Sequence, residues 1–310
     1  MNRIFNVCMF VICSLLLLSS CDKESNSIDI FYDYKVKNQE GFDIYSIILC
    51  SYNEDTTFLT GIKNEKMWVG MFDEHTKEQL KEWNGTETIE RTIKIDLGYG
   101  KTELLNIVSF GFKLGIYKTN WGYIPTLTYG VILPTLGGGT ALEKDILLLN
   151  DDKMIVYSAV NPSIIQSHWY QESIVVSSYI RDSYSYKVVS PEGKEIVELK
   201  SKPYNRLIEL ENLFPVSYTD GIGFYERGRG YDNKKCDIYI HRVNYAISKD
   251  LWDIPISSLT NIEKDALFNI TILEQSNPIW KFQIDISNYD GSKKQVIFTV
   301  DVETGKVTEI

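Results

Sequence analysis

The chain has 310 residues, with 32 Lys and Arg against 42 Asp and Glu, and its formal net charge is −10 at pH 7. Nucleic-acid binding depends on basic side chains that neutralise phosphates, and no local Lys/Arg cluster offsets this acidic balance, so we expect no nucleic-acid partner. The length suffices for one large all-β domain or two smaller ones.

The first 20 residues have the pattern of an export signal. Arg3 supplies a positive start, and the apolar stretch from Val7 to Leu18 is shorter than the roughly 20 residues of a membrane-spanning helix. The stretch ends in Leu18-Ser19-Ser20-Cys21 and lacks the A-x-A-like site of an ordinary secretory signal. These four positions resemble the lipobox of bacterial lipoproteins. The resemblance implies cleavage before Cys21 and lipidation of Cys21, which would anchor the mature chain to a membrane.

Residues 21–29 read as a polar tether with too little apolar content to fold alone. The acidic start after Cys21 resembles the surface-export signal of Bacteroidales-type lipoproteins, although Lys23 interrupts the acids. That resemblance implies a lipid-anchored protein of the outer membrane, exposed on the cell surface. An ordinary solvated linker is the alternative, and in enterobacteria an aspartate directly after the cysteine would instead imply retention at the inner membrane.

Residues 30–310 are predicted to form a single all-β domain. Val, Ile, Tyr, Phe and Thr alternate with polar residues, and turn residues recur at intervals of roughly ten. Glu74 to Trp83 reads as a loop followed by a strand rather than as a helix. Four strand-turn units are predicted, in which Gly, Asp or Asn supplies the turn geometry: Lys66–Asp73 with Glu78–Trp83, Lys187–Ser190 with Glu195–Leu199, Trp280–Ser287 with Gln295–Val302, and a last turn at Glu303–Lys306 before Val307–Ile310.

The strand-turn units resemble one another at irregular intervals, as the outer strands of β-propeller blades do. We therefore predict a β-propeller-like fold, with room for roughly six blades of about 40 to 45 residues. A β-sandwich, or a pair of sandwiches, is the alternative. The sequence pattern from Trp68 through Trp83 is similar to that of uncharacterised Bacteroidales-type lipoproteins. This resemblance includes no catalytic motif.

No residue spacing points to a metal or a cofactor. The three histidines, His75, His168 and His241, stand singly, and the cysteines that remain beyond Cys21 are Cys50 and Cys236. In an oxidising compartment these two cysteines could form a disulfide, or they could be buried thiols that behave as small hydrophobes.

Two glycine-rich segments are candidates for ligand loops. Gly137-Gly138-Gly139 lacks the Lys-Ser/Thr pair of a phosphate-binding loop and reads as a flexible loop. Gly221 and Gly223 have the wrong spacing for a dinucleotide fingerprint and read as points of tight packing. The mixed-charge segment from Glu226 to Asp232 is the loop best suited to binding.

Aromatic residues carry the strongest functional signal of the domain. Trp169, Tyr170, Tyr184 and Tyr186 lie in a segment of strong alternation, so some should face outward as a ligand platform. Tyrosine is also a good strand former, which is the structural alternative. We predict a non-enzymatic binding module for a glycan, a peptide or an envelope protein. A glycan-active hydrolase that uses a carboxylate pair is the alternative.

Overall fold

The computed structural model describes residues 27–98, 101–133, 138–180, 183–203, 213–229, 235–263 and 266–310. The predicted signal (residues 1–20) and Cys21 lie outside these residues. About 68% of the described residues are in strands. The described helices are α2 (Ser27–Asp33) and the single 3-10 turns η1 (Tyr170–Glu172) and η2 (Ser257–Leu259). None of the described helices is long and apolar enough to cross a membrane. The all-β prediction is confirmed.

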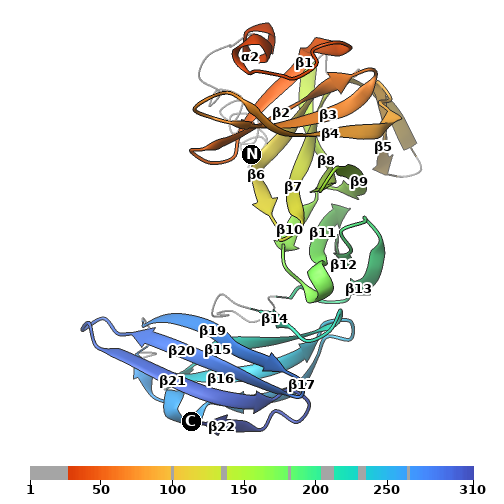
Figure 1. Ribbon diagram of the computed structural model, residues 1–310. Coiled ribbons are helices and arrows are strands. Elements are labelled where there is room, and N and C mark those ends of the chain that lie inside the picture. The colour runs from red at the N-terminus through yellow and green to blue at the C-terminus, as the bar shows by residue number, and fades with distance from the viewer. Residues whose placement is uncertain are drawn as a thin grey trace, which may run out of the picture. The chain divides into compact units, whose positions relative to one another are not determined.

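The described strands form five sheets, in which strand order follows chain order (Figure 1). Sheet 1 comprises β1 (Phe42–Ser51), β2 (Thr56–Lys63), β3 (Lys66–Asp73) and β4 (Gln79–Thr88). Sheet 2 comprises β5 (Thr92–Gly98), β6 (Lys101–Lys118), β7 (Gly122–Leu133), β8 (Gly138–Asn150) and β9 (Lys153–Val160). Sheet 3 comprises β10 (Ser163–Gln166), β11 (Ile174–Ile180), β12 (Ser183–Val189) and β13 (Glu195–Leu199).

Sheet 4 comprises β14 (Phe214–Pro215), β15 (Asp220–Arg229), β16 (Lys235–Asn244) and β17 (Lys249–Pro255), and β18 (Ile262–Glu263) also pairs with β16. Sheet 5 comprises β19 (Leu267–Ser276), β20 (Ile279–Ser287), β21 (Lys293–Asp301) and β22 (Val307–Glu309). Small sheets that follow one another along the chain, each with its strands in chain order, are the building plan of propeller blades.

Sheet 3 is buried on both faces at the end of the β11–β12 pairing where Ile174 lies opposite Val189. Val175 and Val188 point into a core that includes Leu213, next to sheet 4. The neighbouring residue Val176 points the other way, into a core with Leu148 of sheet 2. A two-layer sandwich leaves one face of each sheet to solvent, whereas a sheet between two neighbours is covered twice. The domain is therefore propeller-like.

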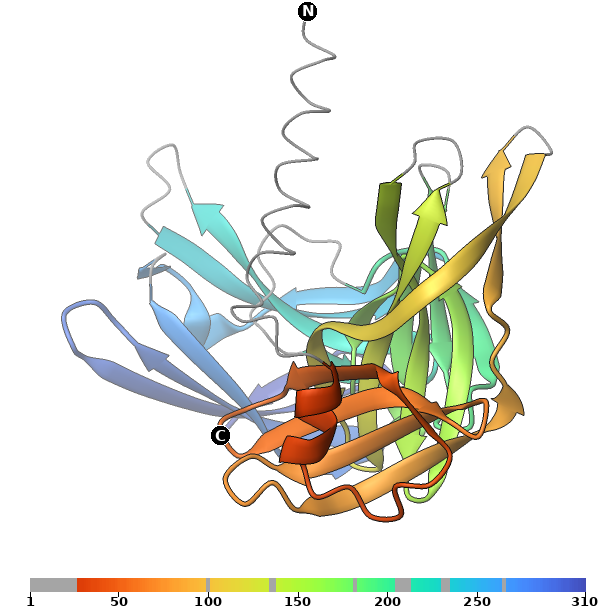
Figure 2. The same ribbon diagram turned by 90° about the horizontal axis from the view of Figure 1, so that it is seen from above.

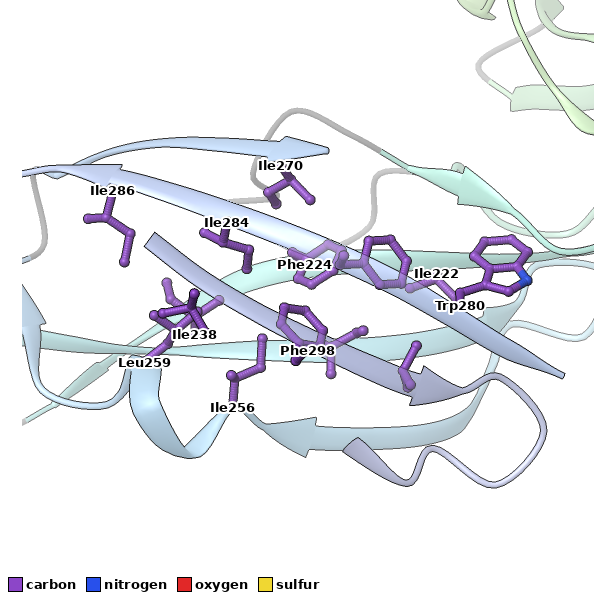
Figure 3. Packing of buried hydrophobic residues seen from close by; sticks show 14 of the residues in the cluster. Ile222, Phe224, Ile238, Ile256, Leu259, Ile270, Trp280, Ile284, Ile286 and Phe298 are labelled. Atoms are coloured by element: carbon purple, nitrogen blue, oxygen red, sulfur yellow. The ribbon is translucent and has the colours of Figure 1, made fainter. Parts of the chain in front are cut away.

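Sheets 4 and 5 share the largest core. Phe224 of β15 meets Phe282 of β20 with ring centroids 5.3 Å apart, and Phe298 of β21 lies 5.7 Å from Phe282. Figure 3 shows Phe224, Phe298 and Trp280 between the two sheets. Cys236 is 1% exposed and belongs to this core, whereas Cys50 is half-buried in β1.

The chain divides into two compact units. The first takes the described residues of 1–115, 127–142 and 152–154, and the second takes the rest. Sheet 1 belongs to the first unit, sheets 3 to 5 belong to the second, and strands of sheet 2 run through both. The prediction of a single domain over residues 30–310 stays a prediction.

The predicted strand-turn units are confirmed. β3 pairs with β4, β12 with β13, β20 with β21, and β21 with β22. Three of the connecting turns place a glycine at positive φ: Gly193 at 77°, Gly291 at 82° and Gly305 at 75°. Glycine adopts this conformation without steric cost, which is why these short sequences specify their turns.

The segment around Ile30 differs from the prediction. Ser27–Asp33 forms helix α2, where the sequence predicts a polar tether and then a strand. Phe31 is 2% exposed and Tyr34 is 4% exposed, because both are packed against residues of sheet 1. Figure 2 shows helix α2, in red, beside the strands of sheet 1. Phe31 lies in α2 and Tyr34 directly follows it, where the amide of Tyr34 still donates to the carbonyl oxygen of Ile30 at 3.3 Å, so a spacing of three residues puts both side chains on one side. Tertiary packing thus orders a segment that is too short to be a stable helix alone.

Candidate functional site

The four aromatic residues of the predicted platform divide into two groups. In the β11–β12 pairing, Ile174 lies opposite Val189 at one end, and Tyr179 lies opposite Tyr184 at the other end. Trp169 and Tyr170 precede the Ile174 end of this hairpin. The prediction that the four residues share one platform is therefore wrong, because the length of β11 separates the two groups.

Trp169 belongs to the interior. Its side chain is 4% exposed, its indole nitrogen donates to the carbonyl oxygen of Tyr218 at 3.0 Å, and its ring lies 6.2 Å from Tyr245. A stacking platform needs an exposed ring face, so the placement of Trp169 on such a platform is corrected. The sequence alone does not predict whether Trp169 is buried, because an aromatic residue in an irregular loop can be either buried or exposed.

Tyr170 lies half-buried in the loop before β11. Its ring meets that of Tyr218 edge-on, at 5.0 Å between centroids. The next two residues, Gln171 and Glu172, have φ values of 49° and 62°, a left-handed conformation that non-glycine residues seldom adopt. The indole nitrogen of Trp121 donates to the carbonyl oxygen of Glu172 at 2.9 Å, which helps to hold this backbone.

The exposed aromatic group comprises Tyr179, Tyr184 and Tyr186, which we call the tyrosine ladder. Tyr184 and Tyr186 are two residues apart on β12, so they share one face. Their rings are parallel within 10°, with centroids 6.1 Å apart, and Tyr179 lies 4.7 Å from Tyr184 across the strand pair. Tyr184 is 62% exposed, whereas the other two are half-buried.

The tyrosine ladder adjoins the core between sheets 3 and 4. Tyr186 packs at the edge of that core, two residues before the buried Val188. Burial, with a smaller effect of Tyr184, raises the pKa of Tyr186. The phenol is therefore neutral at physiological pH and can donate or accept a hydrogen bond.

The alternation Ser-Tyr-Ser-Tyr in β12 separates this aromatic face from a polar one. Ser185 donates to a carboxylate oxygen of Glu198 at 3.2 Å. Lys187 reaches both carboxylate oxygens of Glu195 at 2.7 Å. Lys187, Glu195 and Glu198 thus lie on the face of the sheet opposite the ladder, where each has a hydrogen-bond partner.

Six described carboxyl groups have a lowered pKa, the wrong direction for a general acid, which needs a raised pKa near the working pH. Lys187 is the main cause for Glu195, and hydrogen bonds from side chains or turn backbone are the main cause for four others: Asp73, Asp285, Asp290 and Asp301. Burial alone would raise the pKa of Glu74, but hydrogen bonds from Lys77, Thr57 and Tyr34 outweigh it and lower that pKa. Within the described ranges, no group of three His, Cys, Asp or Glu side chains is placed to hold a metal ion.

The histidines and glycine-rich segments are placed as follows. His75 is exposed beside Asp55, at 3.1 Å, and His168 lies exposed in the loop before β11. His241 is 1% exposed on β16, and a side chain at Gly223 would lie 2.6 Å from its ring, which confirms tight packing at that glycine. Gly138 and Gly139 begin β8, and Glu226–Arg229 end β15, so these parts are strand rather than loop. Gly137 and residues 230–232 lie outside the described residues.

Comparison with known proteins yields no matching family model and no matching curated protein. Among solved structures, a Podospora anserina α-L-arabinofuranosidase aligns at 10% identity and a TM-score of 0.27, over 63% of this chain and 65% of that one. The β-propeller domain of Vanderwaltozyma polyspora Nup133 aligns at 6% identity and a TM-score of 0.30, over 86% of this chain and 92% of that one. Likenesses at this level carry no argument about fold or function.

Proposed function

We propose that the protein is a lipid-anchored envelope protein, held at a membrane through Cys21, whose β domain is a non-enzymatic binding module. Its ligand is a neutral glycan that stacks on the tyrosine ladder. The observation that carries this proposal is the exposed ring of Tyr184, supported from two sides by Tyr179 and Tyr186.

The chemistry of the tyrosine ladder favours a sugar. An aromatic face attracts the C–H groups of a sugar ring, and phenol hydroxyls bond the sugar hydroxyls at the rim. The ladder offers aromatic faces and hydroxyl groups, and the chain carries a net charge of −10, which disfavours anionic ligands. Support from Tyr186, which packs against the core, lowers the entropy lost when a ligand orders the exposed ring.

A binding screen tests the ladder. The mature protein is applied to glycan and peptide arrays, and any ligand found is titrated against wild type, Tyr184→Ala and Tyr184→Phe. Loss of a central aromatic anchor usually costs more than 1 kcal/mol, so we expect Tyr184→Ala to weaken glycan binding about tenfold. Tyr184→Phe should weaken it less, because the ring remains.

Tyr289 provides the matched control. It is 86% exposed in the turn between β20 and β21, so Tyr289→Ala removes an accessible tyrosine without touching the ladder. We expect this variant to bind as wild type. Binding that survives Tyr184→Ala, or that falls equally in both variants, would refute the ladder as the site. Turnover of a glycan would overturn the binding module in favour of a hydrolase.

The membrane anchor is tested separately. Wild type is expected to partition into the detergent phase, and Cys21→Ala is expected to stay in the aqueous phase, because several acyl chains on one cysteine give stable anchoring. Equal partitioning of the two proteins would exclude Cys21 as the anchor.

A further inference from the structure

The segment that follows the predicted tether is fixed to sheet 1. Phe31 of α2 lies 5.1 Å from Phe42, measured between ring centroids, and Tyr34 lies 5.2 Å from Phe72. The Tyr34 hydroxyl donates to a carboxylate oxygen of Glu74 at 2.8 Å. These contacts are buried, so α2 cannot leave the sheet without exposing two aromatic side chains.

The backbone beyond α2 is also bound. The amide of Lys35 donates to the carbonyl oxygen of Lys77 at 2.9 Å, and the amide of Lys37 donates to the side-chain oxygen of Gln79 at 2.7 Å. The chain from Ser27 onward therefore adds no slack between a lipid on Cys21 and the folded domain. Residues 22–26 make up the rest of the connection between Cys21 and α2.

Chain geometry sets the reach of this connection. Six residue-to-residue steps separate Cys21 from Ser27, and a fully extended chain covers at most about 3.3–3.6 Å per step, or about 20–22 Å in all. This distance is shorter than β1, whose ten residues span about 33 Å. A lipid on Cys21 would hold the first turn of α2 within that distance of the bilayer surface.

We infer that the bilayer surface is the partner of the α2 face of sheet 1, held there by the short connection. The inference rests on the proposed lipidation of Cys21. The outward residues of α2 determine the character of this contact: Asp29 and Asp33 are exposed, and Tyr32 is 64% exposed. Carboxylates are repelled by anionic headgroups, so this face lies beside the membrane without inserting into it. Tyr32 is of the amphipathic type that suits the headgroup level.

Fluorescence quenching in vesicles tests the inference. Tyr32→Cys is made in a Cys50→Ser background, labelled with a fluorophore, and reconstituted as the lipidated protein. The vesicles contain phosphatidylethanolamine and phosphatidylglycerol with a nitroxide on a fraction of the headgroups. A matched variant carries a 20-residue Gly/Ser insert between Asn26 and Ser27, with a root-mean-square span of about 25 Å by itself. We expect strong quenching with the native connection and at least a twofold loss with the insert.

Two further measurements separate the inference from the proposed anchor. Detergent-phase partitioning is measured first, and failure to partition would refute lipidation itself. A protein that partitions normally, but shows equal quenching with and without the insert or no quenching at all, would refute only the inference that the α2 face lies at the bilayer surface. Labelled Cys21→Ala protein should show no quenching. Quenching of that protein would mean that the face binds lipid by its own affinity, which would overturn the role of the short connection.

Discussion

Arg242 joins sheet 4 to the last hairpin of sheet 5, and its loss should be among the most destabilising changes in the chain. The residue is 8% exposed. Its guanidinium donates to the Asp220 carboxylate at 3.0 Å and to the carbonyl oxygen of Val302 at 2.8 Å, and it lies 3.2 Å from a carboxylate oxygen of Glu303. The Arg242 guanidinium thus has a buried carboxylate partner, Asp220, and an exposed one, Glu303, so the effects of losing each ion pair can be compared in one protein.

The expected loss in the free energy of unfolding follows from the difference in burial between Asp220 and Glu303. Arg242→Met keeps the apolar stem but leaves the Asp220 carboxylate, 8% exposed, without its cation. Removal of one partner of a buried ion pair costs about 3–5 kcal/mol. Glu303 is 65% exposed at its side chain, so Glu303→Gln should cost less than about 1 kcal/mol. In the double variant Arg242→Met/Asp220→Asn the buried charge is gone, and we expect partial recovery of the free energy of unfolding.

Urea unfolding followed by tryptophan fluorescence measures these differences. Trp252 is a suitable reporter because its indole nitrogen donates to the same Val302 carbonyl oxygen, at 3.0 Å. Equal losses in Arg242→Met and Glu303→Gln would refute the reasoning from burial. A double variant no more stable than Arg242→Met would show that an uncompensated charge is not the source of the loss.

Two other changes give sharp expectations. Burial, and then a hydrogen bond to Glu195 at 2.8 Å, raise the pKa of Tyr157 above its ordinary value of 10.0. The neutral phenol therefore contributes fully to the stability of the folded state below pH 10, and this contribution falls as pH rises toward the folded-state pKa. Tyr157→Phe should therefore flatten the alkaline decline of Tm, and parallel Tm curves for the two proteins would count against the assignment. Gly305 and Gly291 have φ of 75° and 82°, so alanine at either should cost about 1–2 kcal/mol in the left-handed conformation. A Cβ atom at Gly305 would also lie 2.8 Å from Trp252, whereas a Cβ atom at Gly291 would have no described heavy atom within 4 Å beyond its two chain neighbours. Gly305→Ala should therefore lower Tm more than Gly291→Ala, and an equal effect would exclude the contact with Trp252.

The sequence predicted the hairpins well because their information is local. The turn through Gly193 and the turn through Gly291 each combine a positive-φ glycine with flanking alternation, and the pairing of β12 with β13 and of β20 with β21 follows. Helix α2 was missed because its order comes from Phe31 and Tyr34 packing against a sheet that lies later in the chain. No local sequence pattern predicts that this segment packs against sheet 1.

The candidate site was predicted in part for a similar reason. Alternation in β12 places Tyr184 and Tyr186 on one face, and that much is readable from the residues alone. Which face lies open depends on how far the neighbouring sheet covers it. The core of sheets 3 and 4 takes in Val188 and the edge of Tyr186, and ends before Tyr184. The burial of Trp169 likewise depends on Tyr218 and Tyr245, which come about 50 to 75 residues later.

One end of sheet 3 is buried on both faces, and this burial leads to a test of the stacked arrangement. Val175 is 0% exposed and Val176 is 1% exposed, although successive residues of a strand point to opposite faces. Val→Ala removes the equivalent of two methylene groups, worth about 1.6 kcal/mol, and the cavity raises the loss to about 2–3 kcal/mol. Val175→Ala and Val176→Ala should therefore lower the free energy of unfolding by similar amounts.

Val156 supplies the control for this comparison, because it is 49% exposed on the edge strand β9. Val156→Ala should cost less than about 1 kcal/mol. In a two-layer sandwich, one of the two successive valines would face solvent and would behave like Val156. Urea unfolding of the three variants separates the arrangements: a small loss at either Val175 or Val176 would contradict the stacking of sheet 3 between two neighbours, whereas two large losses require a core on each side of one sheet.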